Sequence, residues 1–568
     1  MNKALLSSSS ACVFILGLCA LAPHAAAEPQ FVMRGFLFYD VAAQGGDRDA
    51  MCHLAYLYAH GIGTPIDLPA ALDWYTKAAN AGDAEAMNNI GFLFQHGQGV
   101  SVSNDQALQW YTKAATAGNA HACTNIGYMY SRGLGVEASR GRAISWYRKG
   151  AAAHDSTALY NLARLLRQLD PPDTQEVVTS FEQAAQLGDV PAMNALGDLF
   201  RTGDGQPIDL PRALSWYTQA ANAGDVHAMD RVGLFYQNGS GIPADPLQAM
   251  AWFQRAGDAG LAQALTHLGQ VYARGIGVHP DYVQAMSCYH RAADQGDAEA
   301  MNAIALLYQN GQGVAADDVQ AFAWFQKAAN GGNASAMNSV GFFYDKGRGT
   351  EVNPRRAVQW YRRAADGDDA DGMFNLGIAY ETGQGLSPDN SLALRWLSRA
   401  AAANHVRAMR ALGFLYENGK ASDVDPMATA IEWFKRAAAG GDVDSMFHLG
   451  ALYDFGDRVP KDYSAALHFY QQAAAAGDTL AMCFIGTIYQ EGRGVPVDYK
   501  QALNWYTKAA DAGDTEACCD IAFLHSHGLG FPQSYSAALD WYRRAAEKLV
   551  NVCSSDFPVS VVRTKWTG

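Results

Sequence analysis

Residues 83–118 read DAEAMNNIGFLFQHGQGVSVSNDQALQWYTKAATAG, and this 36-residue unit recurs along most of the chain. An aromatic anchor, Trp110 in the quoted stretch, makes the recurrence easy to follow. A fixed period of this length indicates an array of supersecondary units, each of which buries its apolar face against its neighbours. At intervals of 35–37 residues the same slot is occupied by Phe38, Trp74, Trp146, Phe181, Trp216, Trp252, Cys288, Trp324, Trp360, Trp396, Trp433, Phe469, Trp505 and Trp541.

Each unit has the pattern of a helical hairpin. Asp83 is the expected N-cap of a first helix, because its carboxylate can accept from the free N–H groups of the first turn. Apolar residues at 86, 87, 90, 91, 93 and 94 follow at helical spacing and end at Gly97, which permits a left-handed C-terminal residue. A second stripe at 107, 108, 110, 111, 114 and 115 ends at Gly118, and Asn119 is the expected cap of the next unit.

A glycine recurs in the middle of most first helices. Because a mid-helix glycine costs about 1 kcal/mol relative to alanine, its repeated use predicts a compensating close approach of two helices. We expect the tryptophan of the second helix to pack over the gap. The recurring glycines are Gly91, Gly127, Gly197, Gly233, Gly269, Gly341, Gly377, Gly413, Gly450 and Gly486.

The pattern A-M-x-x-[IVL]-G-x-x-[YF]-x-x-G-x-G-V, followed by A-L-x-W-Y-x-K-A-A-x-x-G-D, resembles the Sel1-like repeat, a relative of the tetratricopeptide repeat. It is clear at residues 119–150 and 478–513, and the resemblance covers about residues 31–546. It implies an all-α fold, an α/α solenoid in the form of a right-handed superhelix of about 14 helical hairpins. For function it implies an adaptor, of the kind found in bacterial envelopes, host interaction and endoplasmic-reticulum quality control.

The ends of the chain depart from the repeat. Residues 1–27 are typical of a signal peptide, with Lys3, an apolar core of about 12 residues that is too short to span a bilayer, and an A-x-A site before Glu28. Export to a bacterial periplasm or secreted space is therefore expected, with no transmembrane anchor, and a eukaryotic secretory pathway stays possible. We expect a half repeat or cap at 28–47, the array at 48–546 and a tail or cap at 547–568.

Two places break the phase of the repeat. A proline-containing turn at Pro171 replaces one Gly-x-Gly turn, and a longer turn before Pro426 replaces another. They are either neutral changes in exposed turns or junctions near 170 and 425 that divide the array into blocks.

Charge and motifs exclude several functions. The formal net charge is −14 and no basic stripe appears in the sequence, so neither nucleic acid nor an anionic membrane is an expected partner. Each Gly-x-Gly follows a helix rather than a strand, which argues against a phosphate-binding loop. Histidines show no metal-ligand spacing, no nucleophile stands in a recognisable elbow, and the seven cysteines after the leader are expected to be small buried residues. We therefore predict no enzyme, cofactor or metal site.

Residues that vary between repeats are free for recognition, whereas recurring residues hold the stack together. In the first helix the varying positions are +2, +3, +6, +9 and +10 from the leading alanine, and in the resembled family the first helices line the concave surface. Partial burial of the aromatic residues between neighbouring helices is the alternative. The predicted partner-binding residues are Tyr56, Asn89, Phe92, Asn125, Tyr128, Phe342, Phe374, Phe414 and Phe447.

The predicted function is a non-enzymatic scaffold that binds proteins or peptides, including cell-envelope or host proteins, on its concave helix face. One alternative is a secreted host-interaction factor. Another is a cell-wall or β-lactam enzyme, but the cysteine-rich relatives reported to act on β-lactams carry regularly spaced cysteine pairs that this chain lacks.

Overall fold

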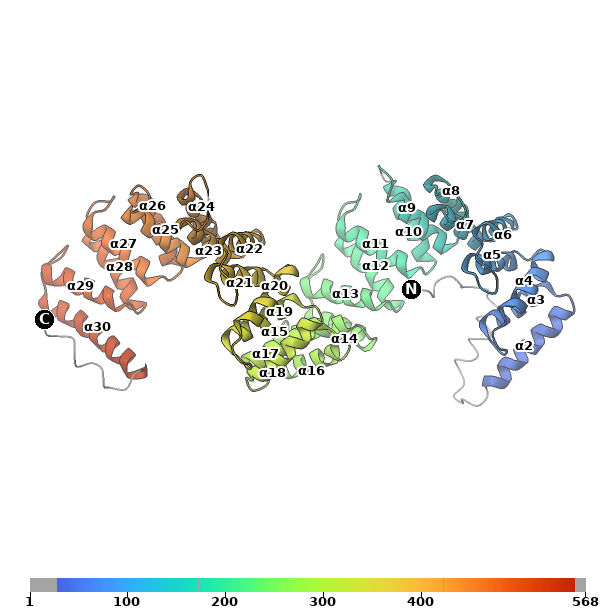
Figure 1. Ribbon diagram of the computed structural model, residues 1–568, viewed down its shortest axis with the longest axis horizontal. Coiled ribbons are helices and arrows are strands. Elements are labelled where there is room, and N and C mark those ends of the chain that lie inside the picture. The colour runs from blue at the N-terminus through green and yellow to red at the C-terminus, as the bar shows by residue number, and fades with distance from the viewer. Residues whose placement is uncertain (1–27, 172, 422, 557–568) are drawn as a thin grey trace. The chain divides into compact units, whose positions relative to one another are not determined.

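The computed structural model describes residues 28–171, 173–421 and 423–556, and every regular element in these ranges is an α-helix (Figure 1). The expected signal peptide lies outside the described residues, as do residues 557–568. The chain divides into two compact units. Unit 1 is Met1–Val271 with Gly275–His279, and unit 2 is Tyr272–Arg274 with Pro280–Gly568. The expected junctions near 170 and 425 stay predictions.

After α2 (Glu28–Gln44) the helices alternate as 14 hairpins, which confirms the repeat count expected from the sequence. The first helices are α3 (Arg48–His60), α5 (Ala84–His96), α7 (Ala120–Arg132), α9 (Ser156–Leu166), α11 (Val190–Thr202), α13 (Val226–Asn238), α15 (Ala262–Arg274), α17 (Ala298–Asn310), α19 (Ala334–Lys346), α21 (Ala370–Thr382), α23 (Val406–Glu417), α25 (Val443–Phe455), α27 (Thr479–Glu491) and α29 (Thr515–His527). The second helices are α4 (Leu68–Asn80), α6 (Asn104–Thr116), α8 (Arg140–Ala152), α10 (Thr174–Gln186), α12 (Leu210–Asn222), α14 (Pro246–Asp258), α16 (Tyr282–Ala293), α18 (Asp318–Asn330), α20 (Pro354–Asp366), α22 (Asn390–Ala402), α24 (Pro426–Ala439), α26 (Tyr463–Ala475), α28 (Tyr499–Asp511) and α30 (Tyr535–Asp556).

Contacts between helices are almost all between neighbours in the chain. From α2 to α14, and again from α16 to α30, each helix packs against the next one, as the successive ribbons of each unit show in Figure 1. Packing of this kind buries one continuous apolar layer per unit without any sheet or long-range closure. The fold is therefore an all-α, α/α solenoid.

The expected caps set the helix boundaries. The Asp83 carboxylate accepts from the Ala86 N–H at 2.7 Å, and Asn119 accepts from Ala122 N–H at 2.8 Å. Gly97 ends α5 with φ at 67°, a left-handed conformation that a side chain disfavours. Because the same residue types recur in the same slots of most repeats, the caps place most hairpins in the same register.

The second glycine of the Gly-x-Gly turn has a packing role. A Cβ atom at Gly99 would lie 2.6 Å from the Leu68 Cβ atom, at the start of the preceding repeat's second helix. The turn of one repeat therefore rests on the second helix of the repeat before it. This contact explains the glycine pair without a bound phosphate.

The mid-helix glycines do lie beneath a ring, but the ring is not the predicted tryptophan. A Cβ atom at Gly127 would lie 2.7 Å from two ring atoms of Tyr147, the residue after Trp146. Neighbouring residues of a helix point about 100° apart, so only one of the two rings can face the glycine. The same contact joins Gly91 to Tyr111, Gly197 to Tyr217, Gly233 to Phe253, Gly341 to Tyr361, Gly413 to Phe434, Gly450 to Tyr470 and Gly486 to Tyr506.

The tryptophans of the repeat instead lie half-buried on the second helices, and all of them except Trp216, which is followed by Gln219, have a cation beside the ring. Lys149 Nζ lies 3.8 Å from the ring centroid of Trp146, and Arg363 Cζ lies 4.2 Å from that of Trp360. The basic residue is three positions after the ring, so both lie on the same helix face. The tryptophan slot is thus a covered outer stripe rather than the centre of the core.

Both phase breaks shorten a first helix. α9 has 11 residues and α23 has 12, whereas most first helices have 13. The peptide bond between Asp170 and Pro171 is cis, and Pro426 begins α24 at a position where proline is tolerated. The two helical residues missing from α9 and the one missing from α23 are replaced by loop.

Two details of the chain's second half differ from expectation. Cys519 is exposed and Cys483 is half-buried, because they occupy positions +2 of α29 and α27, while Cys52, Cys123, Cys288 and Cys518 are buried as expected. The seventh cysteine lies among residues whose side chains the structure does not describe. α30 continues to Asp556, so the first part of the predicted tail is helical.

Candidate protein-binding face

Five positions of each first helix vary from repeat to repeat. Counted from the alanine that leads the apolar stripe, such as Ala86 on α5, they are +2, +3, +6, +9 and +10. Side chains at helical spacing share one side of a helix, so equivalent positions of successive repeats form rows within each unit. We call the surface formed by these positions the first-helix face.

In unit 1 the +6 row begins with three aromatic side chains, Tyr56, Phe92 and Tyr128, on α3, α5 and α7. Tyr128 is 42% exposed, while Tyr56 and Phe92 are half-buried. The structure thus places these three predicted residues on successive first helices, with part of each ring accessible. Partial burial, the alternative from the sequence, applies to two of the three.

A histidine one turn later covers two of these rings. The His60 ring lies 4.0 Å from the Tyr56 ring, and the His96 ring lies 4.1 Å from the Phe92 ring, both between centroids. His60 Nδ1 is 2.9 Å from the Tyr56 carbonyl oxygen. A carbonyl can only accept, so Nδ1 donates this hydrogen bond. The sequence reasoning missed these histidines, although the i, i+4 spacing was readable.

The four aromatic residues predicted in unit 2 lie in different surroundings. Phe414 is 36% exposed and contacts the Phe434 ring edge-on at 5.0 Å. Phe374 stacks on His405 at 4.7 Å between centroids. Phe342 and Phe447 are half-buried. The Phe447 ring lies edge-on to the ring of Phe484 in the next repeat.

The two predicted asparagines make contacts within the stack. Asn125 donates from Nδ2 to Oδ1 of Asn88, one repeat earlier, at 2.9 Å. Asn375 makes the same bond to Asn338 at 2.8 Å in unit 2. Asn89 is half-buried beside the hydroxyl of Tyr75. Variation at +2 and +3 therefore reflects inter-repeat pairing as well as any role in recognition.

Position +9 also bridges repeats. Lys420 Nζ lies 2.9 Å from Oε1 of Glu381, and Arg493 Nη1 lies 2.6 Å from Oδ1 of Asp454. In each pair the acid is at +9 of one first helix and the base is in the turn that ends the next first helix. We call these contacts turn bridges. In unit 1 the signs are reversed, with Arg167 Nε 2.6 Å from Oδ2 of Asp204.

A buried carboxylate joins two repeats at the N-cap of α9. Asp155 accepts from the Thr124 hydroxyl at 2.7 Å and lies 3.2 Å from His121 Nδ1. Burial acts to raise the pKa of Asp155, but the bonds from His121 and Thr124 outweigh it and hold that pKa below its usual range. The same bond raises the pKa of His121. The cluster is typical of a structural ion pair.

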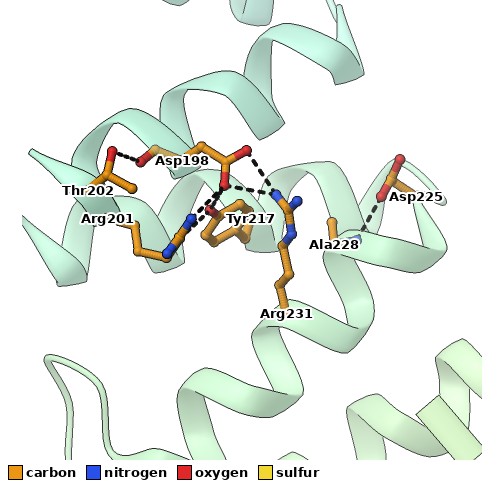
Figure 2. A network of polar contacts seen from close by, with 7 residues as sticks. All are labelled: Asp198, Arg201, Thr202, Tyr217, Asp225, Ala228 and Arg231. Carbon is orange, nitrogen blue, oxygen red and sulfur yellow. Dashed lines mark hydrogen bonds and ion pairs between the residues drawn. The ribbon is translucent and has the colours of Figure 1, made fainter. Parts of the chain in front are cut away.

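Asp198 is the centre of a larger network, which Figure 2 shows from close by. Its Oδ1 atom accepts from the Tyr217 hydroxyl at 2.7 Å and lies 3.4 Å from Nη2 of Arg201. Nη1 of Arg231, on the next first helix, lies 3.2 Å from both carboxylate oxygens. One carboxylate at +6 thus orients two guanidinium groups that stay partly exposed.

Thirteen segments of the chain match the Sel1 repeat model. The chain belongs to the Sel1 repeat family. The matches include the quoted unit and follow the hairpins of the structure. They cover residues 48–83, 84–119, 120–155, 190–225, 226–261, 262–297, 298–333, 334–369, 370–405, 406–442, 443–478, 479–514 and 515–548.

The segment 156–189 is absent from these matches although it folds as the hairpin α9–α10. It is the unit in which Pro171 replaces the Gly-x-Gly turn. The assignment of Phe181 to the tryptophan slot is wrong by one residue: Phe181 is the eighth residue of α10, the place that Tyr147 has in α8, and it is buried like that tyrosine. The Sel1 architecture is therefore continuous through a repeat whose sequence signature is weakened.

Solved structures of the same architecture resemble the chain. One is the crystal structure of c5321, which is described as a protective antigen present in uropathogenic Escherichia coli strains and as displaying an SLR fold. Its sequence is 25% identical, the TM-score is 0.53, and the match covers 94% of this chain and 99% of that chain. A Sel1 repeat protein from Oxalobacter formigenes has 32% identity and a TM-score of 0.40, covering 44% of this chain and 99% of that chain. No curated protein sequence matches.

No helix in the ranges 28–171, 173–421 and 423–556 has both the length and the apolar composition to span a membrane. In the same part of the chain no three His, Cys, Asp or Glu side chains gather as a metal-ion site would require.

Proposed function

We propose that this Sel1 repeat protein is an exported, non-enzymatic scaffold that binds protein partners along its first-helix face, on the concave side of the solenoid. Sel1 solenoids are typically protein-interaction scaffolds, and their family is generally non-enzymatic. The observation that carries the proposal for this chain is the row of partly exposed rings on α3, α5 and α7. In these repeats the buried rings are those of Tyr75, Tyr111 and Tyr147 on the second helices, whereas the first-helix rings keep an accessible part.

Aromatic side chains with both a buried and an accessible part suit partner binding. They supply a large apolar area at a low cost in side-chain entropy, and binding hot spots are enriched in them. The basic residue that follows each ring adds a polar group at the edge of the same surface. The proposed partner is therefore a protein or peptide segment.

A secreted host-interaction factor is the second candidate. The observation in its favour is the similarity of the whole chain to c5321, which is described as a protective antigen of uropathogenic Escherichia coli strains. A protein recognised as an antigen is in contact with the host. The two candidates share the same binding face and differ in the source of the partner.

Crosslinking followed by affinity capture tests the proposal. The triple variant Tyr56→Ala, Phe92→Ala and Tyr128→Ala should lose captured partners that the unaltered chain retains. A matched control removes exposed apolar residues of second helices, Leu247, Val283 and Val319, and should keep the partners. Equal loss in both variants would contradict the proposal. Turnover of a cell-wall or β-lactam substrate by the unaltered chain would favour the enzyme alternative.

A further inference from the structure

Four successive first helices of unit 1 each place one arginine on the first-helix face. They are Arg132 on α7, Arg164 on α9, Arg201 on α11 and Arg231 on α13, at +10, +6, +9 and +3. We call this set the arginine row. These residues are 30–37 positions apart and so form no basic stripe in the sequence, but the fold brings them onto neighbouring first helices.

The first two members of the row lack a carboxylate partner. Arg132 and Arg164 are exposed, and each lies against the tyrosine four residues before it, with Cζ 5.9 Å from the Tyr128 ring and 5.6 Å from the Tyr160 ring. Within the described residues neither forms an ion pair. A ring beside the guanidinium leaves its N–H groups available to an incoming acceptor.

The other two members share one carboxylate. Asp198 contacts both Arg201 and Arg231, as the dashed lines of Figure 2 show, and their side chains are still 48% and 41% exposed. The first-helix face of these four helices also holds two carboxylates, Asp198 and Asp230, so the four arginines leave a formal charge of 4 − 2 = +2. Arg167 does not add to this excess, because Asp204 neutralises it in a turn bridge.

The excess is not a consequence of composition. The whole chain has a net charge of −14, so a random surface patch is expected to be acidic. In unit 2 the four charged +9 side chains all have basic partners: those of Glu381, Glu417 and Asp454 come from neighbouring repeats, and that of Asp345 is the adjacent Lys346. An uncompensated cationic row in an acidic protein indicates a site for an anionic partner.

We propose that the arginine row binds an acidic segment of a partner protein in extended conformation. This inference rests on the proposed scaffold function and names the chemistry of its partner. Neighbouring helices lie about 8–10 Å apart, which is about three residues of extended chain at roughly 3.3 Å each. Acidic side chains about three residues apart can therefore each reach one arginine, through charge-assisted hydrogen bonds. Tyr128 and Phe92, on α7 and α5, lie next to the row and accept an apolar flank of the same segment.

The test measures binding of labelled peptides to the full chain by fluorescence anisotropy. The probe is a 14-residue peptide with glutamate at every third position and two phenylalanines at one end. A second peptide has glutamine in place of each glutamate. Unlabelled single-stranded DNA serves as competitor, because it is the other polyanion that a cationic row attracts.

The double variant Arg132→Glu with Arg164→Glu reverses charge without removing an internal ion pair. We expect it to weaken binding of the glutamate peptide at least tenfold. The control Arg255→Glu makes a charge reversal on the second helix α14, where the side chain is exposed beside Trp252, and should leave affinity within twofold. Thermal melts of all variants verify folding.

Selective binding of the glutamate peptide that falls with added salt and with the double variant supports the inference. Equal affinity for the glutamine peptide, an equal loss in the Arg255 control, no binding of either peptide, or displacement by DNA at lower concentration than by unlabelled peptide overturns it. Partner capture that depends on the aromatic residues but not on the arginines would overturn this inference and leave the scaffold function intact.

Discussion

At the residue scale, the pairing of Gly127 with Tyr147 shows why a costly glycine recurs. A side chain at Gly127 would meet the ring at 2.7 Å, far inside van der Waals contact, and the ring is held by the buried layer around it. The first and second helices of a repeat can approach closely only because this atom is missing. The close approach compensates for the low helix propensity of glycine.

Gly127→Ala should therefore destabilise the protein by about 1–3 kcal/mol, the usual cost of overpacking, and Gly127→Leu by more. Gly141 offers a control in the same repeat, because a Cβ atom there would contact nothing within 4 Å. Gly141→Ala should be neutral or stabilising by about 0.5–1 kcal/mol through helix propensity. Thermal or urea unfolding measures both changes. Similar effects at the two glycines would contradict the packing account.

Asp520 on α29 gives a second prediction at this scale. Burial, with the nearby carboxylates of Glu516 and Asp514, raises the pKa of Asp520 to about 6. An unfolded aspartate titrates near pH 4, so between about pH 4 and pH 6 the folded protein holds a proton that the unfolded chain has lost. Stability therefore falls as pH rises through this window.

Asp520→Asn removes the charge and should raise Tm at pH 7.5 by roughly 2–4 °C, the shift expected for about 1 kcal/mol after solvent screening. At pH 4 the variant and the unaltered protein should melt together, since the carboxyl is then largely protonated when folded. Differential scanning calorimetry at the two pH values makes the comparison. A constant difference at both pH values would assign the effect to packing rather than to charge.

At the scale of elements, the turn bridges connect successive repeats at a few places along the array. The bridge between Asp454 and Arg493 is the most enclosed, since the aspartate side chain is 0% exposed and lies 2.6 Å from the guanidinium. Burial raises the pKa of Asp454 even though Arg493 counteracts it. Burying these two charges costs desolvation energy, and only their mutual attraction offsets it, so neither residue can stay buried and charged without the other.

Arg493→Leu should cost about 3–5 kcal/mol, because it leaves a buried carboxylate without its cation. The double variant Arg493→Leu with Asp454→Leu should be less destabilised than the single one. Arg167→Leu, which breaks the exposed bridge to Asp204, should cost less than about 1 kcal/mol. Urea unfolding of the four proteins provides the test. A double variant with a lower free energy of unfolding than Arg493→Leu would contradict this expectation and show that the pair itself stabilises the array.

The helices and their caps were predictable from the sequence because they depend on short-range patterns. Asp83, Gly97 and Asn119 each act within a few residues of their own position, and the same residue types recur at the equivalent positions of many repeats. The ring over the mid-helix glycine was predicted wrongly, since Trp146 and Tyr147 are adjacent and a period of 36 cannot tell which one faces inward. The orientation of the second helix decides it.

The candidate site was predictable only in part. The aromatic +6 positions could be located on one face, but the turn bridges join residues 37–39 apart in different repeats. Nor does the sequence distance between Arg132 and Arg231 suggest a common surface. Pairing across the stack, such as Asn125 with Asn88, depends on the register of neighbouring helices. Variation between repeats therefore marks both stacking partners and candidate contacts.

At the scale of the whole molecule, the array separates stability from recognition. Recurring glycines, caps and buried rings hold the hairpins together through contacts between neighbours. Side chains of the first-helix face can then change from repeat to repeat with a small effect on the fold. Unit 1 uses this freedom for rings and uncompensated arginines, and unit 2 for rings and balanced ion pairs.

Site-specific photocrosslinking in the native host tests the central claim most directly. The photoreactive residue p-benzoylphenylalanine would replace Tyr128 on the first-helix face or, in a matched variant, Leu247 on the second helix α14; both positions are exposed and lie in unit 1. We predict light-dependent crosslinks to partner proteins from position 128 and none from position 247. Crosslinks from position 247 alone would contradict the assignment of the first-helix face as the binding surface.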